Sequence, residues 1–180
     1  MQSIFWYDWI LTFLLTVIVL IWAARFVKKN SSDKIIAGYF KKGLLLKILG
    51  CIAYGVYHEY VYKGGDTFSY FHTAKQVGGY LFTDFDRFIK LTFYSVEKSM
   101  DVRQDDTWLD YIMVMSESNT FQVRLAAIIQ LFTFGSYLPT SMIFSLLSYV
   151  AIWKCFKTFC RIYPDKEKYL AIPFLFIPTV

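Results

Sequence analysis

The sequence predicts an all-α protein whose helices cross a membrane several times, with amphipathic surface helices in its first large extracytoplasmic loop. Three observations support this fold class. Hydrophobic residues make up 56% of the 180 residues, aromatic residues make up 21%, and the mean hydropathy is +0.40, which is too apolar for an ordinary soluble domain. Long apolar runs alternate with short basic segments. The longest polar stretch carries helical spacing of its apolar residues.

The first apolar run begins in an aromatic cluster and ends in basic residues. No charged residue occurs from Trp9 to Ala24, and the rings of Phe5, Trp6 and Tyr7 precede this run. Aromatic residues are typical of the point where a helix meets the membrane interface, so we predict a transmembrane helix from about Ile4 to Val27. Because a secretory signal has its basic residues before the apolar core, we expect this segment to remain as an anchor.

The basic segment that follows predicts the orientation. Seven lysines and arginines stand between Arg25 and Lys47 against one acid, Asp33. A short loop this basic is retained on the cytoplasmic side, so the N-terminus is expected outside. Gly43 to Tyr62 is then the second span, running outward, with Lys47 reaching back to the cytoplasmic headgroups.

Residues 63–122 are predicted to form an extracytoplasmic loop. They hold nine acids and six basic residues, and their net charge is therefore −3. Apolar residues recur at helical spacing in two places, which predicts two amphipathic helices lying on the membrane surface. The first comprises Phe85, Phe88, Ile89, Thr92, Phe93 and Val96; the second comprises Trp108, Tyr111, Ile112 and Met115, with Asp105 or Asp106 as its cap.

Two further apolar runs follow, separated by a break at Gly135–Pro139. The second ends in a basic cluster, which would lie outside if both runs spanned the membrane. We therefore predict that Phe121–Phe134 dips into or lies along the outer surface, and that Thr140–Phe159 is a third, inward span. Tyr169–Val180 is too short to cross a membrane. This pattern predicts a single membrane domain over residues 1–180, the N-terminal part of a longer protein.

Several classes of function are excluded by composition and motif. The net charge of +5 lies beside apolar runs rather than on a polar surface, so no nucleic-acid partner is expected. Three cysteines in or beside apolar segments predict neither a disulfide framework nor a metal site. His58-Glu59 lacks the second histidine of a zinc hydrolase motif. No metal site is predicted. The sequence does not indicate a divalent ion but leaves one open, and the cofactor is unknown.

Asp66 is the candidate catalytic residue. It follows Gly64-Gly65, directly after the second apolar helix, where the chain leaves the membrane. One interpretation is that Asp66 only caps a helix starting at Thr67, a contact worth about 1 kcal/mol. The other is that the glycines let a ligand approach the backbone, and that the carboxylate takes a proton from an acceptor hydroxyl. Both hold if that helix faces a cavity.

Four other residues are candidates for substrate binding. Tyr70 would share a helix face with Asp66, and His72 would flank that face. Tyr70 could bond a sugar or phosphate, or be an interfacial aromatic residue. Glu59 could line the cavity or pair with Lys63 one turn later. Arg124 could hold a lipid phosphate with two hydrogen bonds, or anchor a helix at the headgroups.

The run Gly64-Gly65-Asp66-Thr67-x-x-Tyr70, the later Val123-Arg124-Leu125-Ala126 and the Pro173 to Pro178-Thr179 segment resemble the GT-C superfamily of membrane glycosyltransferases, in particular bacterial mannosyltransferase-like members. The resemblance implies that Asp66 is the catalytic base, and that Arg124 contacts the donor or its phosphate. It also implies a polyprenyl-phosphate-linked sugar donor in an outer-leaflet cavity. In that superfamily the loop commonly follows the first helix, whereas here it follows the second.

The expected function is transfer of a sugar from this lipid-linked donor, in contact with membrane lipids, at the outer face of a bacterial inner membrane. Two alternatives stay open. A similar run occurs in polysaccharide polymerases, whose donor would be a lipid-diphosphate-linked oligosaccharide. A protein without catalytic activity, such as a membrane scaffold or a transporter component, would use Asp66 only as a cap.

Overall fold

The computed structural model of the chain describes residues 4–94 and 117–177. All regular structure in these ranges is helical, with seven α-helices, short π-helical segments and no strand. The all-α prediction is therefore confirmed for the described residues. The chain forms two compact units, unit 1 comprising Met1–Ile4 and His58–Thr140, and unit 2 comprising Phe5–Tyr57 and Ser141–Val180.

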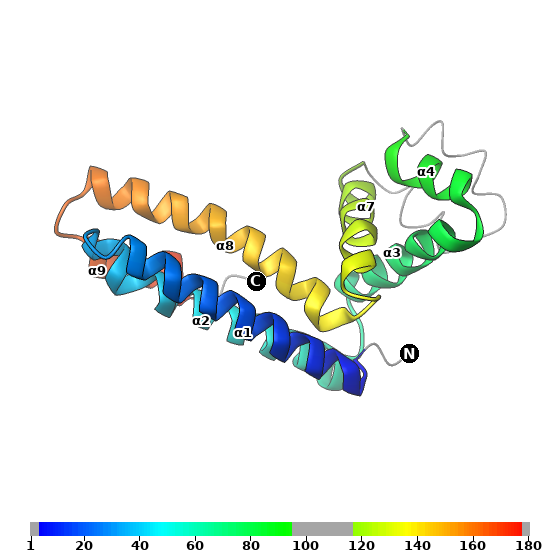
Figure 1. Cartoon of the computed structure of the whole chain (residues 1–180), viewed down its shortest axis with the longest axis horizontal. Coiled ribbons are helices and arrows are strands. Elements are labelled where there is room, and N and C mark those ends of the chain that lie inside the picture. The colour runs from blue at the N-terminus through cyan, green and yellow to red at the C-terminus, as the bar shows by residue number, and fades with distance from the viewer. Residues whose placement is uncertain (1–3, 95–116, 178–180) are drawn as a thin grey trace. The chain divides into compact units, whose positions relative to one another are not determined.

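Unit 2 is built from long helices that lie side by side (Figure 1). Helix α1 spans Trp6–Lys29, close to the predicted first span. The π-helix η1, Ile36–Phe40, leads into α2, Lys41–Tyr57. Helix α8, Tyr137–Ile162, starts in unit 1 and runs through unit 2. It is followed by α9, Glu167–Ala171, and the π-helix η4, Ile172–Phe176.

Aromatic rings hold these helices together around Phe40. Its ring centroid lies 4.8 Å from that of Phe26 on α1 and 4.9 Å from that of Trp153 on α8. The buried hydroxyl of Tyr149 on α8 donates a 2.6 Å hydrogen bond to the carbonyl of Phe40. At Gly43 a β-carbon would come within 3.0 Å of that hydroxyl, so glycine is needed for the close approach of α2 and α8.

An ion pair connects the α1–η1 turn to the C-terminal part of α8. Lys157 Nζ lies 2.9 Å from Asp33 Oδ2, and Asp33 Oδ1 also accepts hydrogen bonds from the backbone of Ile35 and Ile36. The basic end of α8 is therefore on the same side of unit 2 as the basic α1–η1 segment. The inward direction of Thr140–Phe159 stays a prediction. Tyr57, where the chain leaves unit 2, is the last residue of α2, and Ser141, where the chain returns to unit 2, is near the start of α8.

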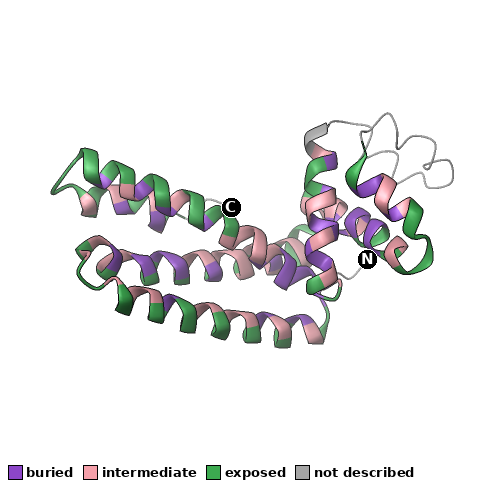
Figure 2. Ribbon diagram, turned by 45° about the horizontal axis from the view of Figure 1, so that its top comes forward, coloured by how far each residue is buried: buried purple, intermediate pink, exposed green. Residues whose placement is uncertain are grey.

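Within residues 4–94 and 117–177, two helices are long and apolar enough to cross a membrane: α1, with mean hydropathy 2.4, and α8, with 1.3. A core helix of a soluble protein would be mostly buried, but only 11% of the apolar window of α1 and 22% of that of α8 are buried. Figure 2 shows exposed positions along the long helices. Large apolar side chains such as Phe13 and Ile18 are more than half exposed. Burying this surface in lipid or against another protein would be strongly favourable.

Unit 1 contains shorter helices packed around α3. The π-helix η2, His58–Tyr62, precedes α3, Asp66–Thr83, which is followed by α4, Phe85–Phe93, and α7, Glu117–Phe132. Helix α3 packs mainly against α7, where Gly78 lies close to the carbonyl of Ala127. Gln130 Nε2 on α7 donates a 3.0 Å hydrogen bond to the carbonyl of Phe71. The start of α8 completes the unit, since Tyr137 stacks on Phe68 with ring centroids 4.4 Å apart.

The predicted amphipathic helix around Phe85–Phe93 is confirmed as α4, and Asp84 caps it by accepting a 3.1 Å hydrogen bond from the Arg87 backbone. Its predicted apolar face is divided, however. Phe88 is buried in contact with neighbouring helices, whereas Phe85 and Phe93 are exposed. Val96 and the second predicted helix, including Trp108, Met115, Asp105 and Asp106, lie outside the described residues.

The break before α8 is shorter than the sequence predicts. Phe134 and Gly135 adopt φ values of 53° and 65°, and α8 already begins at Tyr137. Pro139 therefore stands in the first turn of α8, where its missing N–H would have no helical partner. The predicted second span, Gly43 to Tyr62, is not among the described helices that are long and apolar enough to cross a membrane, because α2 ends at Tyr57 after 17 residues. The remaining predicted residues form η2 in unit 1.

Candidate functional site

The turn that precedes Asp66 is held in place by His58. Lys63 has a left-handed φ of 56°, Gly65 has a φ of 120°, and the backbone N–H of Lys63 donates a 2.8 Å hydrogen bond to the carbonyl of His58. The ring Nδ1 of His58 lies 3.1 Å from the carbonyl oxygen of Gly64. Because a carbonyl can only accept, Nδ1 carries the proton in this contact. His58 thus closes the turn between η2 and α3.

Asp66 is the first residue of α3 and is exposed. Gly65 takes the cap position, since its carbonyl accepts hydrogen bonds from the backbone of Phe68 at 3.1 Å and Ser69 at 3.3 Å. The interpretation of Asp66 as the cap is therefore wrong by one residue. A carboxylate in the first turn still interacts favourably with the helix dipole, by about 0.3–1 kcal/mol. The locked turn fixes where this carboxylate emerges.

The helix face that Asp66 was predicted to share with Tyr70 packs against α7. The Tyr70 hydroxyl donates a 3.0 Å hydrogen bond to Asn119 Oδ1 on α7, and Ala74 on the same face is fully buried. The tyrosine hydroxyl therefore links two helices. Only the N-terminal end of this face, at Asp66, is open.

Arg124 also has a structural partner. Its Nε donates a 2.8 Å hydrogen bond to the carbonyl of Leu91, and its Nη2 donates to the carbonyl of Tyr94. Both carbonyls belong to the C-terminal end of α4, where backbone acceptors lack helical partners. Arg124 thus caps α4 from α7. If the guanidinium group of Arg124 bound a phosphate with two hydrogen bonds, this contact would compete with the two hydrogen bonds to α4.

Glu59 precedes the turn before Asp66 in the sequence, and His72 follows it. Both side chains make contacts within unit 1. Glu59 Oε1 accepts a 3.4 Å hydrogen bond from the backbone of Ile4, which ties the N-terminal segment to η2. His72 is half-buried with its ring edge against Phe71, at a centroid distance of 5.4 Å. Burial and the positive charge of Lys75 lower the pKa of His72, so its ring is neutral at pH 7.

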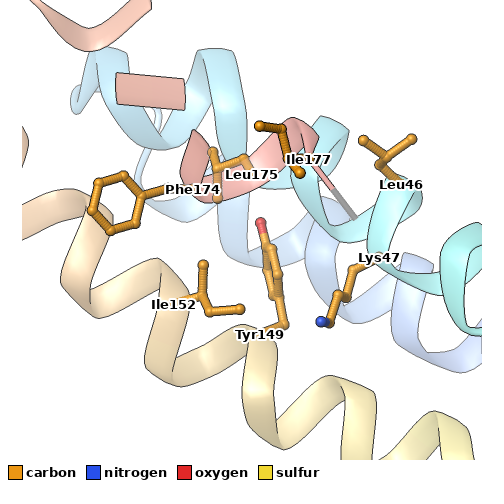
Figure 3. Close-up of a pocket in the computed structure, with 7 residues that line it drawn as sticks. All are labelled: Leu46, Lys47, Tyr149, Ile152, Phe174, Leu175 and Ile177. Atoms are coloured by element: carbon orange, nitrogen blue, oxygen red, sulfur yellow. The ribbon is translucent and has the colours of Figure 1, made fainter. Parts of the chain in front are cut away.

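One small pocket in unit 2 contains none of the predicted site residues. It lies between α2, α8 and η4 and is lined by Leu46, Lys47, Tyr149, Ile152, Phe174, Leu175 and Ile177 (Figure 3). Its free volume of about 10 Å³ has room for roughly one water molecule. Lys47 and Tyr149 line this pocket together (Figure 3). Among the described residues no group of three histidines, cysteines or acids could hold a metal ion.

Sequence reasoning missed two residues that shape the candidate site. His58 was considered only as part of a zinc motif, and its place six residues before Gly64 gave no sign of the contact. Asn119 stood in a polar stretch without periodicity, and nothing distinguished it as the partner of Tyr70. All five predicted residues lie in unit 1, with Asp66 exposed and Tyr70 and Arg124 bound between helices.

No family model, no curated protein and no solved structure matches this chain.

Proposed function

We propose that this chain is part of a membrane glycosyltransferase that transfers a sugar from a polyprenyl-phosphate-linked donor, with Asp66 as the general base. The observation that carries the proposal is the placement of Asp66. Its exposed carboxylate emerges at the start of α3 from a turn locked by His58, one short helix, η2, after the apolar α2. A base for this reaction has to meet both a polar acceptor and a lipid carrier. A carboxylate at the end of an apolar helix meets that requirement.

Membrane insertion is supported by the exposed apolar surface of unit 2. Helices α1 and α8 are long enough to span, and few residues of their apolar windows are buried. The ion pair of Asp33 and Lys157 groups the basic helix ends on one side. With that side in the cytoplasm of a bacterial cell, the ends of α2 and α8 that lead into unit 1 are outside. Residues 63–122, and Asp66 among them, then work at the outer face of the inner membrane.

In the proposed mechanism, Asp66 removes the proton from an acceptor hydroxyl while the acceptor oxygen attacks the anomeric carbon. A new bond forms between this oxygen and the carbon, and the bond from the carbon to the phosphate oxygen breaks. The lipid phosphate leaves with the electron pair, and the proton remains on Asp66. Because Arg124 is committed to α4, exposed Lys63 is the better candidate to stabilise the leaving phosphate.

The test is sugar transfer by the complete protein in membranes, with polyprenyl-phosphate-linked [14C]mannose as the donor. We expect Asp66→Asn to lower the transfer rate about 10²- to 10⁴-fold, because the amide cannot accept the proton. Asp84→Asn is the matched control, since it removes an exposed acid of unit 1 and asparagine still caps α4. If Asp66→Asn transfers mannose at a near-normal rate, Asp66 is not the base.

A second candidate is a membrane scaffold without catalytic activity, which is favoured by the contacts of Tyr70 and Arg124. Both side chains join helices of unit 1, as expected of a packed loop domain. The same assay separates the two, because a scaffold transfers no sugar in wild-type form. A polysaccharide polymerase would instead transfer from a polyprenyl-diphosphate-linked oligosaccharide, which is tested as a second donor.

A further inference from the structure

One end of unit 2 carries a dense group of exposed basic side chains, which we call the basic end. It comprises Arg25, Lys28, Lys29, Lys34, Lys41, Lys42, Lys154, Arg161, Lys166 and Lys168. Asp33, the acid nearest to these residues in the α1–η1 turn, is already paired with Lys157. Two acids, Asp165 in the α8–α9 connection and Glu167 at the start of α9, remain against these ten positive charges. The basic end therefore has a large excess of positive charge.

The fold brings these residues together from distant parts of the sequence. Ring contacts of Phe40 with Phe26 and Trp153 align the C-terminal turns of α1 with the start of α2 and with the C-terminal half of α8. The contact of Asp33 with Lys157 closes the same end. Basic residues of three helices consequently surround one aromatic cluster.

Exposed apolar residues continue directly from these charges along the same helices. On α1, Ile21 and Trp22 are about half exposed and stand one turn before Arg25. On α8, Val150 is half exposed and stands one turn before Lys154. A nucleic acid or an acidic protein surface would use the positive charge but not this apolar band. A phospholipid uses both, because its phosphate pairs with the basic side chains while its acyl chains cover the apolar ones.

We infer that the basic end binds the headgroups of anionic phospholipids in the leaflet that it meets. This inference is independent of sugar transfer and of Asp66, since it concerns unit 2 alone. Each basic side chain near an anionic surface contributes enough attraction to change affinity about fivefold at low salt. The basic end therefore selects phosphatidylglycerol over the zwitterionic phosphatidylcholine.

The experiment reconstitutes the complete protein in phosphatidylcholine vesicles and measures the association of spin-labelled phosphatidylglycerol and spin-labelled phosphatidylcholine by electron paramagnetic resonance. Both leaflets contribute to the signal, so the orientation of the protein in the vesicle does not matter. We expect the wild type to prefer phosphatidylglycerol at low salt. The preference should shrink at about 1 M salt, where the Debye length is about 3 Å.

Substitutions in the basic end test whether its side chains cause the preference for phosphatidylglycerol. Replacing two of its lysines, Lys28→Gln with Lys154→Gln, is expected to reduce the phosphatidylglycerol preference about fivefold for each lysine. Lys75→Gln with Lys90→Gln is the matched control, because it removes the same number of positive charges from unit 1. The charge-preserving pair Lys28→Arg with Lys154→Arg should keep the preference. Equal association of both lipids with the wild type, or equal loss in the two Gln variants, would overturn the inference.

Discussion

Replacing Gly65 by alanine is expected to destabilise the turn that positions Asp66. Gly65 has a φ of 120°, a backbone conformation that is essentially restricted to glycine, and a non-glycine residue there costs about 1–3 kcal/mol. The added β-carbon would also lie 3.2 Å from Nδ1 of the His58 ring. That ring cannot move without stretching its 3.1 Å contact with the Gly64 carbonyl. We therefore expect Gly65→Ala to lower the free energy of unfolding by about 1–3 kcal/mol.

Gly64→Ala is the matched control for this prediction. No atom lies within 4 Å of a β-carbon placed on Gly64, and its φ is not in the left-handed region. Restricting the unfolded chain alone makes such a substitution neutral or stabilising, by up to about 1 kcal/mol. The assay is equilibrium unfolding of both purified variants in the same detergent micelles. Equal stabilities of Gly64→Ala and Gly65→Ala would show that the backbone at Gly65 does not require glycine.

The same two substitutions also distinguish the role of Gly65 in forming the turn from a role of Gly64 in letting a ligand approach the backbone. Gly64 is the position with open space around it, so it is the glycine that a ligand could approach. We expect Gly64→Ala to fold normally and to transfer less sugar.

Three other substitutions test the contacts of the structure. Arg124→Lys should lower the free energy of unfolding by about 2 kcal/mol, because one ammonium group cannot replace both guanidinium contacts to α4; urea titration measures this. Tyr70→Phe should cost about 1 kcal/mol in the same titration, without a change in transfer rate if its hydroxyl serves packing alone. Burial by itself would raise the pKa of Asp33, but hydrogen bonds from Lys157 and the backbone outweigh it and lower the pKa below its ordinary 3.8. The wild type should therefore be more stable than Asp33→Asn above about pH 4, by less than about 1 kcal/mol at this partly exposed pair, and the advantage should disappear as the pH falls through the lowered pKa.

The long helices could be predicted from the sequence because their apolar runs are uninterrupted and their flanking charges are clear. Residues Ile4 to Val27 and Thr140 to Phe159 match α1 and α8 within a few residues. Helix α4 was predictable for a similar reason, since its apolar spacing follows Asp84, a good cap. The boundary at Tyr57 was not, because the change of helical type from α2 to η2 depends on tertiary contacts.

The candidate site was less predictable, because side-chain partners depend on elements far away in sequence. The sequence could indicate that Gly64-Gly65 forms a turn and that Asp66 opens a helix, since both follow from local conformational preference. It could not indicate that Arg124 reaches the carbonyls of Leu91 and Tyr94, some thirty residues earlier. A guanidinium at a predicted membrane surface suits a phosphate and a helix end equally well. Only the packing of α7 on α4 distinguishes them.

The central claim is that unit 2 spans the membrane with its basic end in the cytoplasm and with Asp66 on the outer side. The most direct measurement is labelling of single cysteines with a membrane-impermeant maleimide in intact cells, in a background where Cys51, Cys155 and Cys160 are replaced by alanine. A cysteine at exposed Ser32, in the α1–η1 turn, should react only after permeabilisation, and a cysteine at Asp66 should react in intact cells. Labelling of the Ser32 position in intact cells, with protection of the Asp66 position, would contradict the account.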